Sequence, residues 1–179
     1  MYAEERQRAI VEQARRDGRV EVAQLAEDLA VTPETIRRDL THLEPEVIDR
    51  QLQALAAAAE DAPCDVWTMA PMIATVAEAR GFTSRARALG LSTVGVMVEV
   101  PLLALQADRL VDVVDFVSIG TNDLSQYAFA ADRLVGELGA LLDPWQQALP
   151  QLVARVADAG SRSGVPVGVC GEAASDPLL

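Results

Sequence analysis

The sequence contains no lysine, since all fifteen of its basic residues are arginine. Chemistry that needs a lysine Schiff base, or the lysine of a phosphate-binding P-loop, is therefore excluded. There is one histidine, His42, and only 4% of the residues are aromatic. The core must therefore be built from Val, Leu, Ala and Ile. Half of the residues are apolar, which is typical of a globular chain rather than a disordered one.

Cysteine is also scarce. Cys64 and Cys170 lie far apart and follow no secretory signal, so we expect free thiols in a reducing, cytoplasmic compartment. Charged residues break the apolar runs well before membrane-spanning length, which predicts no transmembrane helix. The net charge of −12 argues against a chain that binds nucleic acid over its whole surface. A local basic face remains compatible with that charge.

Three short helices are predicted within the first forty-four residues. Their apolar positions recur every three or four residues, and Gly18 ends the first helix. Thr32 is a good N-cap for the third helix, and Pro33 suits its first position. Ile36 and Leu40 are expected to be buried. A tight turn before the third helix is typical of a helix-turn-helix, whose last helix enters the major groove of DNA.

Four polar side chains at the start of this third helix are candidates for DNA contacts. Arg37 and Arg38 have the reach for phosphates or guanine edges, while Thr32 and Thr35 suit phosphate oxygens. The same pattern fits any three-helix bundle with a solvated arginine pair. Pattern alone leaves these two interpretations even.

The amino-acid sequence of this segment, RQRAIVEQARRDGRVEVAQLAEDLAVTPETIRRDLTHLE, resembles the N-terminal DNA-binding domain of DeoR-type bacterial repressors. The resemblance implies a small all-α (winged) helix-turn-helix domain over residues 1–44 that binds DNA. That family has a basic β-wing after the third helix, whereas here Pro45 is expected to end the helix and acidic residues follow. Residues 1–44 carry seven arginines and ten acidic residues, a net charge of −3. Because DNA affinity relies on phosphate neutralisation, we expect weak binding unless the chain dimerises.

From Pro45 onward, apolar runs alternate with helical segments. Such alternation predicts an α/β fold with a parallel sheet buried on both faces. The candidate strands are residues 65–70, 94–100, 114–119 and 165–170. A complete (β/α)8 barrel has eight strands and about 250 residues, whereas residues 45–179 supply 135. If the parent architecture is a barrel, about half of it is absent, and the open edges and faces favour dimerisation or aggregation.

The amino-acid sequence of this second region also resembles that of a known family. The segments MAPMIATVAEA, VGVMVEVP, VDFVSIGTNDLSQYAFAADR and VPVGVCGEAASDP resemble the C-terminal barrel of enzyme I of the bacterial phosphotransferase system. Enzyme I is a phosphoenolpyruvate-protein phosphotransferase. The resemblance implies that residues 45–179 form an incomplete (β/α)8 TIM-barrel segment of the phosphoenolpyruvate/pyruvate type.

Glu99 and Asp123 follow two of the apolar runs, and strand ends are where α/β folds place their chemistry. Their carboxylates suit Mg²⁺, and the resemblance assigns these two positions to the metal ligands. It also implies that Asn122 and Arg133 hold the phosphate, Arg133 from the helix after the Asn122 loop. Cys170 matches the residue that protonates the enolate carbon to give pyruvate. The plainer alternatives are a solvated glutamate, an Asn-Asp helix cap and a small buried cysteine.

Three observations argue against catalysis. Enzyme I passes phosphate through a histidine on a separate domain, yet the single histidine, His42, lies in the recognition helix. Trp67 stands where the family has a substrate-contacting arginine. The strands before residue 45 and after residue 179 of the parent barrel are missing. We therefore predict a DNA-binding regulator joined to a Mg²⁺- and phosphoenolpyruvate-binding segment. The alternatives are a phosphotransferase fragment that is inactive alone, a metabolite-sensing repressor that couples both modules, and a gene remnant.

Overall fold

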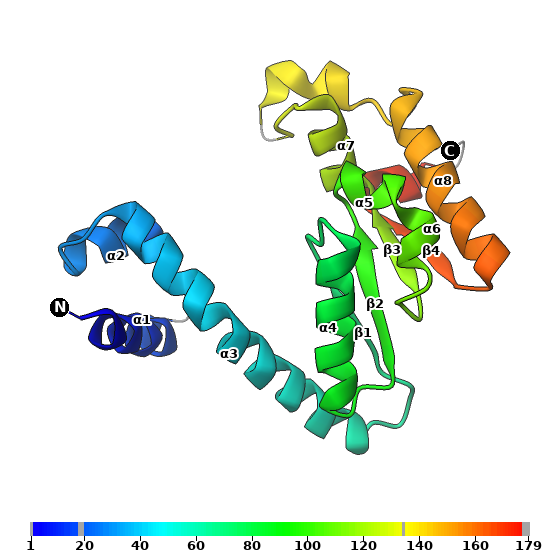
Figure 1. The fold of residues 1–179 in the computed structure, drawn as a ribbon. Coiled ribbons are helices and arrows are strands. Elements are labelled where there is room, and N and C mark those ends of the chain that lie inside the picture. The colour runs from blue at the N-terminus through cyan, green and yellow to red at the C-terminus, as the bar shows by residue number, and fades with distance from the viewer. Residues whose placement is uncertain (1, 18–19, 134, 177–179) are drawn as a thin grey trace. The chain divides into compact units, whose positions relative to one another are not determined.

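The computed structural model describes residues 2–17, 20–133 and 135–176, which form a mixed α/β structure (Figure 1). The chain divides into two units, Met1–Ala54 and Leu55–Leu179. No helix in the described ranges is both long and apolar enough to cross a membrane.

The first unit contains α1 (Ala3–Asp17), α2 (Val22–Asp28) and most of α3 (Pro33–Glu60). These helices match the three that the sequence predicts. The apolar positions of the three helices meet in a small core, whose buried members are Ile10, Leu25, Ala26 and Ile36. The face of each helix that the three- and four-residue spacing of apolar residues predicts to be buried is therefore the face that packs into this core.

The start of α3 follows the predicted capping chemistry. The Oγ1 atom of Thr32 accepts a hydrogen bond from the backbone N–H of Thr35 at 3.3 Å, as an N-cap side chain does. Pro33 is the first helical residue, where its missing N–H costs nothing.

The end of α3 differs from the prediction. We expected Pro45 to end the helix, but this is wrong, because α3 continues through that position to Glu60. A proline inside a helix removes one backbone hydrogen bond. The following residues are rich in Ala, Leu and Gln, which have high helix propensity, and their intact turns continue the helix. The described part of the first unit contains no strand, so a helix runs where a wing would begin.

A buried ion pair joins α1 to α3. The side chain of Asp39 accepts hydrogen bonds from the guanidinium of Arg6, one of them 3.1 Å long, and from Gln7 Nε2 at 3.3 Å. Asp39 is 3% exposed. The hydrogen bond to Asp39 and its negative charge raise the pKa of Arg6 despite the opposing effect of burial. One acid of the TIRRDL segment therefore fixes the recognition helix to α1 instead of facing solvent.

The second unit alternates strands with helices. Its elements are β1 (Trp67–Ala70), α4 (Val76–Ala88), β2 (Thr93–Val98), α5 (Pro101–Leu105), α6 (Ala107–Leu110), β3 (Val117–Gly120), α7 (Thr121–Phe129), the short helix η1 (Gly136–Leu142), α8 (Ala148–Ser163), β4 (Val167–Cys170) and η2 (Glu172–Ser175). All four predicted strands are confirmed, with ends that differ from the prediction by at most three residues.

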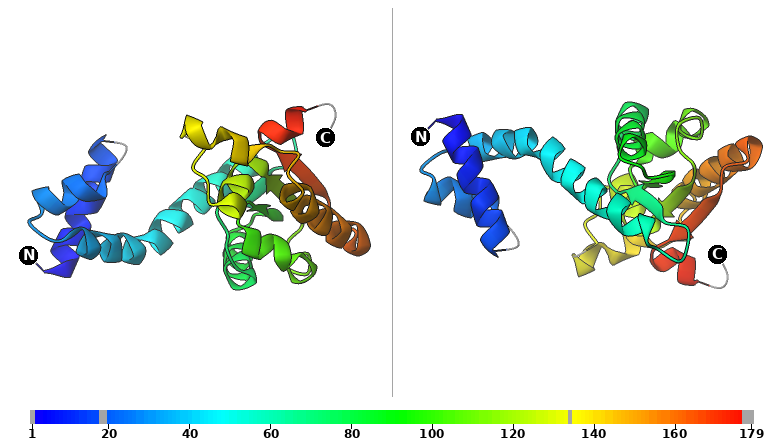
Figure 2. Two further views of the ribbon diagram at one scale, coloured as in Figure 1. Left: turned by 90° about the horizontal axis from the view of Figure 1, so that it is seen from above. Right: turned by 90° about the horizontal axis from the view of Figure 1, so that it is seen from below.

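The four strands form one parallel sheet in the order β1-β2-β3-β4 (Figures 1 and 2). The core of this unit contains side chains from β2 and β3 together with α4, α5, α6 and α8, so these helices cover one face. On the opposite face Trp67 is 55% exposed and Met69 is 37% exposed. The expectation that both faces are buried is therefore wrong. The open, apolar-faced sheet is the one expected of an incomplete barrel, and a closed barrel is not formed by these strands.

Asp115, which lies two residues before the start of β3, connects this segment to the beginning of β2. Its carboxylate accepts hydrogen bonds from the backbone N–H of Val94 at 2.8 Å and from Arg87 Nη2 at 2.9 Å. Its own N–H donates to the carbonyl of Val94 at 2.9 Å. Burial alone would raise the pKa of Asp115, but the bond from Val94 and the hydrogen bond and charge of Arg87 together hold it below its ordinary value. The two central strands are thus aligned by side-chain as well as ladder contacts.

Candidate functional site

Four of the predicted residues lie together at the end of the sheet where the parallel strands have their carboxyl ends. Glu99 directly follows β2, and Cys170 is the last residue of β4. Asn122 and Asp123 lie in the first turn of α7, which begins immediately after β3. The loop that we expected between Gly120 and the helix is therefore absent.

Glu99 is held tightly at this end of the sheet. It is 4% exposed, and its Oε1 atom accepts a 2.6 Å hydrogen bond from the backbone N–H of Met72, a residue with φ of 56°. A Cβ atom on Gly120 would lie 2.8 Å from Glu99 Oε2, so this carboxylate packs directly against the backbone of β3. Glu99 is thus a fixed, buried carboxylate and not the solvated loop residue of the plainer alternative.

The segment after β4 is tied to the start of α7. Thr121 Oγ1 donates a 2.8 Å hydrogen bond to the carbonyl of Cys170, and Asn122 Oδ1 accepts a 2.8 Å bond from the N–H of Glu172. Because the second bond uses the carbonyl oxygen of Asn122, it leaves the amide NH₂ group uncommitted. Asp123 is partly exposed in the first turn of α7, where the helix dipole favours a negative charge.

Cys170 is a half-buried free thiol at the same end of the sheet. Its Sγ atom lies 3.5 Å from Ser118 Oγ, which donates to it, and 3.4 Å from the carbonyl oxygen of Ile119, to which it donates. The thiol therefore lies over β3 on the face of the sheet that carries no helix. Cys64, the second cysteine, is exposed and also free.

Arg133 does not lie on a helix, contrary to our expectation. Ala130 adopts a left-handed conformation with φ of 50° and caps α7, which therefore ends at Phe129. Arg133 follows in a turn, where it is exposed and its N–H donates to Gln126 Oε1 at 3.1 Å. Arg133 therefore lies in nonhelical backbone that is tied to α7 through Gln126.

A cavity of about 510 Å³ brings Arg133 and Asn122 together. Ser125, Glu172 and Asp176 also line it, whereas Glu99, Asp123 and Cys170 do not. The hydroxyl of Ser125 is buried and has no hydrogen-bond partner among the described residues. The sequence analysis did not predict Ser125 or Glu172 as site residues. The spacing of four residues between Thr121 and Ser125 is a signal that could have found Ser125, because it places these two residues on one side of α7. The two predicted phosphate-binding residues therefore share a cavity, and the two predicted metal-binding acids are not part of its lining.

The donor set at the strand ends fits Mg²⁺ only in part. Glu99 and Asp123 offer the carboxylate oxygens that this ion prefers. Within the described ranges, no group of three or more His, Cys, Asp or Glu side chains is placed to hold a metal. Mg²⁺ commonly retains several waters and uses one or two carboxylates plus substrate oxygens. An ion held here would depend on waters and on the oxygens of a ligand.

The predicted DNA contacts lie at the start of α3. Thr32 is exposed and Thr35 is half-buried, and their Oγ1 atoms are 2.9 Å apart, within hydrogen-bond distance. The hydroxyl that accepts this bond keeps its own O–H free to donate to a phosphate oxygen, whereas the one that donates must exchange it. Positions 37 and 38 follow one helical turn later, but the side chains of Arg37 and Arg38 lie outside the described part of the structure.

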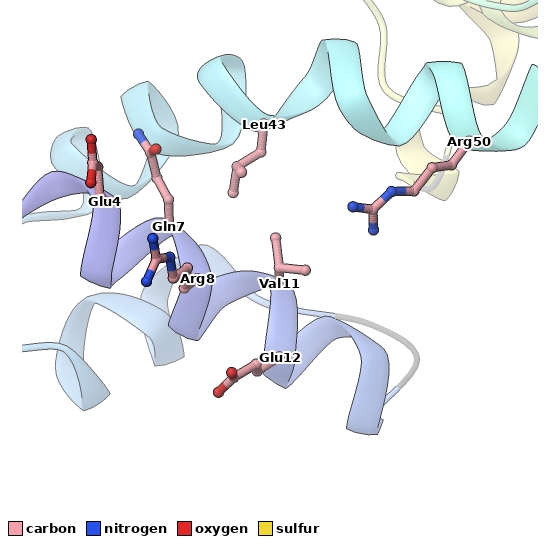
Figure 3. Close-up of a pocket in the computed structure, with 7 residues that line it drawn as sticks. All are labelled: Glu4, Gln7, Arg8, Val11, Glu12, Leu43 and Arg50. Carbon is pink, nitrogen blue, oxygen red and sulfur yellow. The ribbon is translucent and has the colours of Figure 1, made fainter.

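A second cavity, of about 350 Å³, lies between α1 and α3 in the first unit (Figure 3). Val11 of α1 and Leu43 of α3 point toward each other across it, and Arg50 lines it farther along α3. Two arginines and two glutamates share its lining, which favours neither an anion nor a cation. Of the described residues that line this cavity, Arg50 is the one that lies beyond Pro45 on α3.

Comparison with known proteins identifies both units. Residues 33–179 match the model of the PEP-utilising enzyme, PEP-binding domain, and residues 6–54 match the DeoR-like helix-turn-helix domain. The chain belongs to the PEP-utilising enzyme family through its PEP-binding domain and carries a DeoR-like helix-turn-helix domain before it. The two matches overlap between residues 33 and 54, within α3.

Curated relatives of the chain include phosphoenolpyruvate-protein phosphotransferases from several bacteria. The chain is 52% identical over 136 residues to that of Streptomyces coelicolor, which covers 75% of this chain and 24% of the relative. It is 38% identical to those of Latilactobacillus sakei and Bacillus subtilis, over 146 and 151 residues, covering 75% of this chain and 25% of each relative. The chain thus spans about a quarter of the length of these relatives, and its second unit is homologous to part of enzyme I.

Proposed function

We propose that this protein is a DNA-binding transcriptional regulator that acts in the cytoplasm, where its DNA target lies. The observation that carries this proposal is the DeoR-like match over residues 6–54, joined to the capped start of α3. A helix-turn-helix inserts the first turns of its recognition helix into the major groove. Thr32, Thr35, Arg37 and Arg38 then contact phosphates and base edges. We further propose that residues 1–44 form the DNA-binding module and residues 45–179 the barrel segment.

We expect the double variant Arg37→Ala, Arg38→Ala to lose binding to duplex DNA in a fluorescence-anisotropy titration at low salt. Losing two phosphate contacts flattens the slope of log affinity against log salt by about two units, since each contact contributes close to one. The matched control is Arg80→Ala, Arg109→Ala, which removes the same charge from exposed positions of the second unit. Wild-type protein that shows no salt-dependent binding, or equal losses in both double variants, would contradict the proposal.

A second candidate function is binding of phosphoenolpyruvate with Mg²⁺ at the strand ends of the second unit. It is favoured by the match to the PEP-binding domain and by the cavity that Asn122 and Arg133 share. In this proposal Glu99 and Asp123 hold the ion, which supplies positive charge to the phosphate and carboxylate of the ligand. The Asn122 amide and the Arg133 guanidinium bind phosphate oxygens, and the Cys170 thiol gives a proton to the enolate carbon. Phosphoryl transfer would need a phosphate-accepting histidine that the second unit does not contain, because His42, the single histidine of this sequence, lies in the first unit.

We expect isothermal calorimetry to show heat of binding when phosphoenolpyruvate and Mg²⁺ are added to the wild-type chain. Asp123→Ala should remove most of this heat, because it deletes one of two carboxylate ligands. Asp112→Ala, which also removes one acid from the second unit, should behave as the wild type. Equal heats for wild type and Asp123→Ala would rule out this second function.

A further inference from the structure

One face of the four-stranded sheet lacks a helical cover among the described residues. The core packs helices against the opposite face, whereas Trp67, Met69 and Gly168 are exposed on this one. Side chains alternate between the two faces of a strand, so Cys170 of β4 shares the uncovered face with Gly168. Parallel sheets occur almost exclusively with both faces covered, and an exposed apolar patch marks an interaction surface.

The two edges of the sheet are complementary in shape. The order β1-β2-β3-β4 leaves β1 and β4 each with one unpaired edge, and both run in the same direction. On the uncovered face β1 carries the large side chains Trp67 and Met69, while β4 carries Gly168 and the small Cys170. A similar large-against-small contact already exists within the chain, where Met69 is paired with Gly95. An unpaired strand edge is a template for another strand, and here the template fits the opposite edge of a second copy.

We propose that two copies of this chain close their sheets into one eight-stranded parallel barrel, with β4 of each copy paired to β1 of the other. Eight is the number of parallel strands at which side chains fill a barrel interior, and each copy supplies four. A two-fold axis along the barrel makes the two seams identical and leaves no free edge. All eight carboxyl ends then meet at one mouth of the barrel, which contains Glu99, Asp123 and Cys170 twice.

The register of the sheet predicts which residues meet at the seam. A line across the sheet through the paired residues passes from Ala70, the last residue of β1, through Val96 and Val117 to Val167, the first residue of β4. Going from β1 to β4, the strands are therefore shifted progressively in the direction of their carboxyl ends. Barrels of this kind are sheared by about eight residues in a full circuit, hence about four across one half. Continuing this shift in the same direction places Cys170 opposite Met69 of the other copy. It also places Gly168 opposite the other copy's Trp67, so both seam pairs join a large to a small residue.

Sedimentation equilibrium of the full chain should therefore give twice the chain mass of 19.1 kDa. We expect Gly168→Arg to be monomeric, because a side chain at Gly168 meets nothing in a single copy but fills the seam of the closed barrel. Gly136→Arg, also in open space but away from the sheet, should remain dimeric. Far-UV circular dichroism checks that both variants are folded. A stable wild-type monomer, leaving another protein as the occupant of the face, or a dimeric Gly168→Arg, would overturn the proposal.

A cross-link tests the closure itself. In the double variant Cys64→Ser, Met69→Cys, the thiols at positions 69 and 170 lie on opposite edges of one copy's sheet and are offset by four residues along the strands, which places them about 20 Å apart at the strand and residue spacings of a sheet. That separation is beyond the reach of a disulfide, so only a second copy can supply the partner. Oxidised glutathione should link this variant into dimers alone, and Cys64→Ser by itself should not be linked. A ladder of larger species, as from open strand-to-strand association, or the absence of any link would overturn the proposal.

Discussion

Replacing Asp39 by alanine is expected to unfold the first unit, which holds the helix-turn-helix, while the second unit with the four-stranded sheet stays folded. The substitution removes the acceptor of the Arg6 and Gln7 hydrogen bonds that join α1 to α3. Proteins are stabilised by about 0.05–0.15 kcal/mol per residue, so a unit of this size holds only a few kcal/mol in total. Loss of one partner of a buried ion pair is of the same order as that total.

Hydrogen-exchange mass spectrometry separates the two units in this experiment. Peptides from α1 and α2 of Asp39→Ala should exchange rapidly, while peptides from β2 and β3 keep their protection. The control Glu27→Ala removes an exposed acid from α2 and should leave all peptides protected. If the ion pair is the cause, adding Arg6→Ala to Asp39→Ala should cost less than the sum of the two single variants. Unchanged protection in α1 of Asp39→Ala would show that the pair does not hold the unit together.

The same variant separates folding from recognition. Asp39→Ala should lose DNA binding together with the protection of α1, whereas Arg37→Ala, Arg38→Ala should lose binding and stay folded. The TIRRDL segment therefore combines two kinds of residue within two turns of one helix. Its arginines are candidates for DNA contacts, and its acid stabilises the helix that presents them.

The sequence was sufficient where local chemistry decides the structure. Thr32 and Pro33 predict the start of α3 because capping depends on only a few adjacent residues. The four strands could be predicted because short apolar runs that alternate with helical segments are typical of strands in a parallel sheet. The position of Glu99 at a strand end follows from the same pattern.

The sequence was insufficient where distant or competing effects decide. Pro45 is a local signal for a helix end, but the helix propensity of the residues after it prevails. The C-cap at Ala130 depends on a left-handed conformation in a residue that rarely adopts one, so nothing in the sequence placed Arg133 outside a helix. The burial of Asp39 requires Arg6, thirty-three positions earlier, and no periodicity links the two residues.

Gly171 is the residue whose substitution should most damage the edge of the sheet unit. Its backbone, with φ of 93° and ψ of −176°, lies in a region essentially restricted to glycine. A Cβ atom there would lie 2.8 Å from Asn122 Oδ1 and 3.2 Å from its backbone N, in addition to a clash with Thr121. Gly171→Ala therefore displaces η2 from the start of α7 and breaks the bond between Glu172 and Asn122.

We expect Gly171→Ala to lower the unfolding free energy of the sheet unit by about 1–3 kcal/mol for the backbone strain alone, with a further loss from the clash. Urea denaturation followed by circular dichroism measures this change, and the heat of phosphoenolpyruvate and Mg²⁺ binding should fall with it because Asn122 is displaced. The control is Gly81→Ala, where a Cβ meets nothing within 4 Å in the middle of α4. That substitution should be neutral or stabilising by up to about 1 kcal/mol, since alanine is the better helix former. Equal stability of the two variants would mean that η2 is not held against α7 through Gly171.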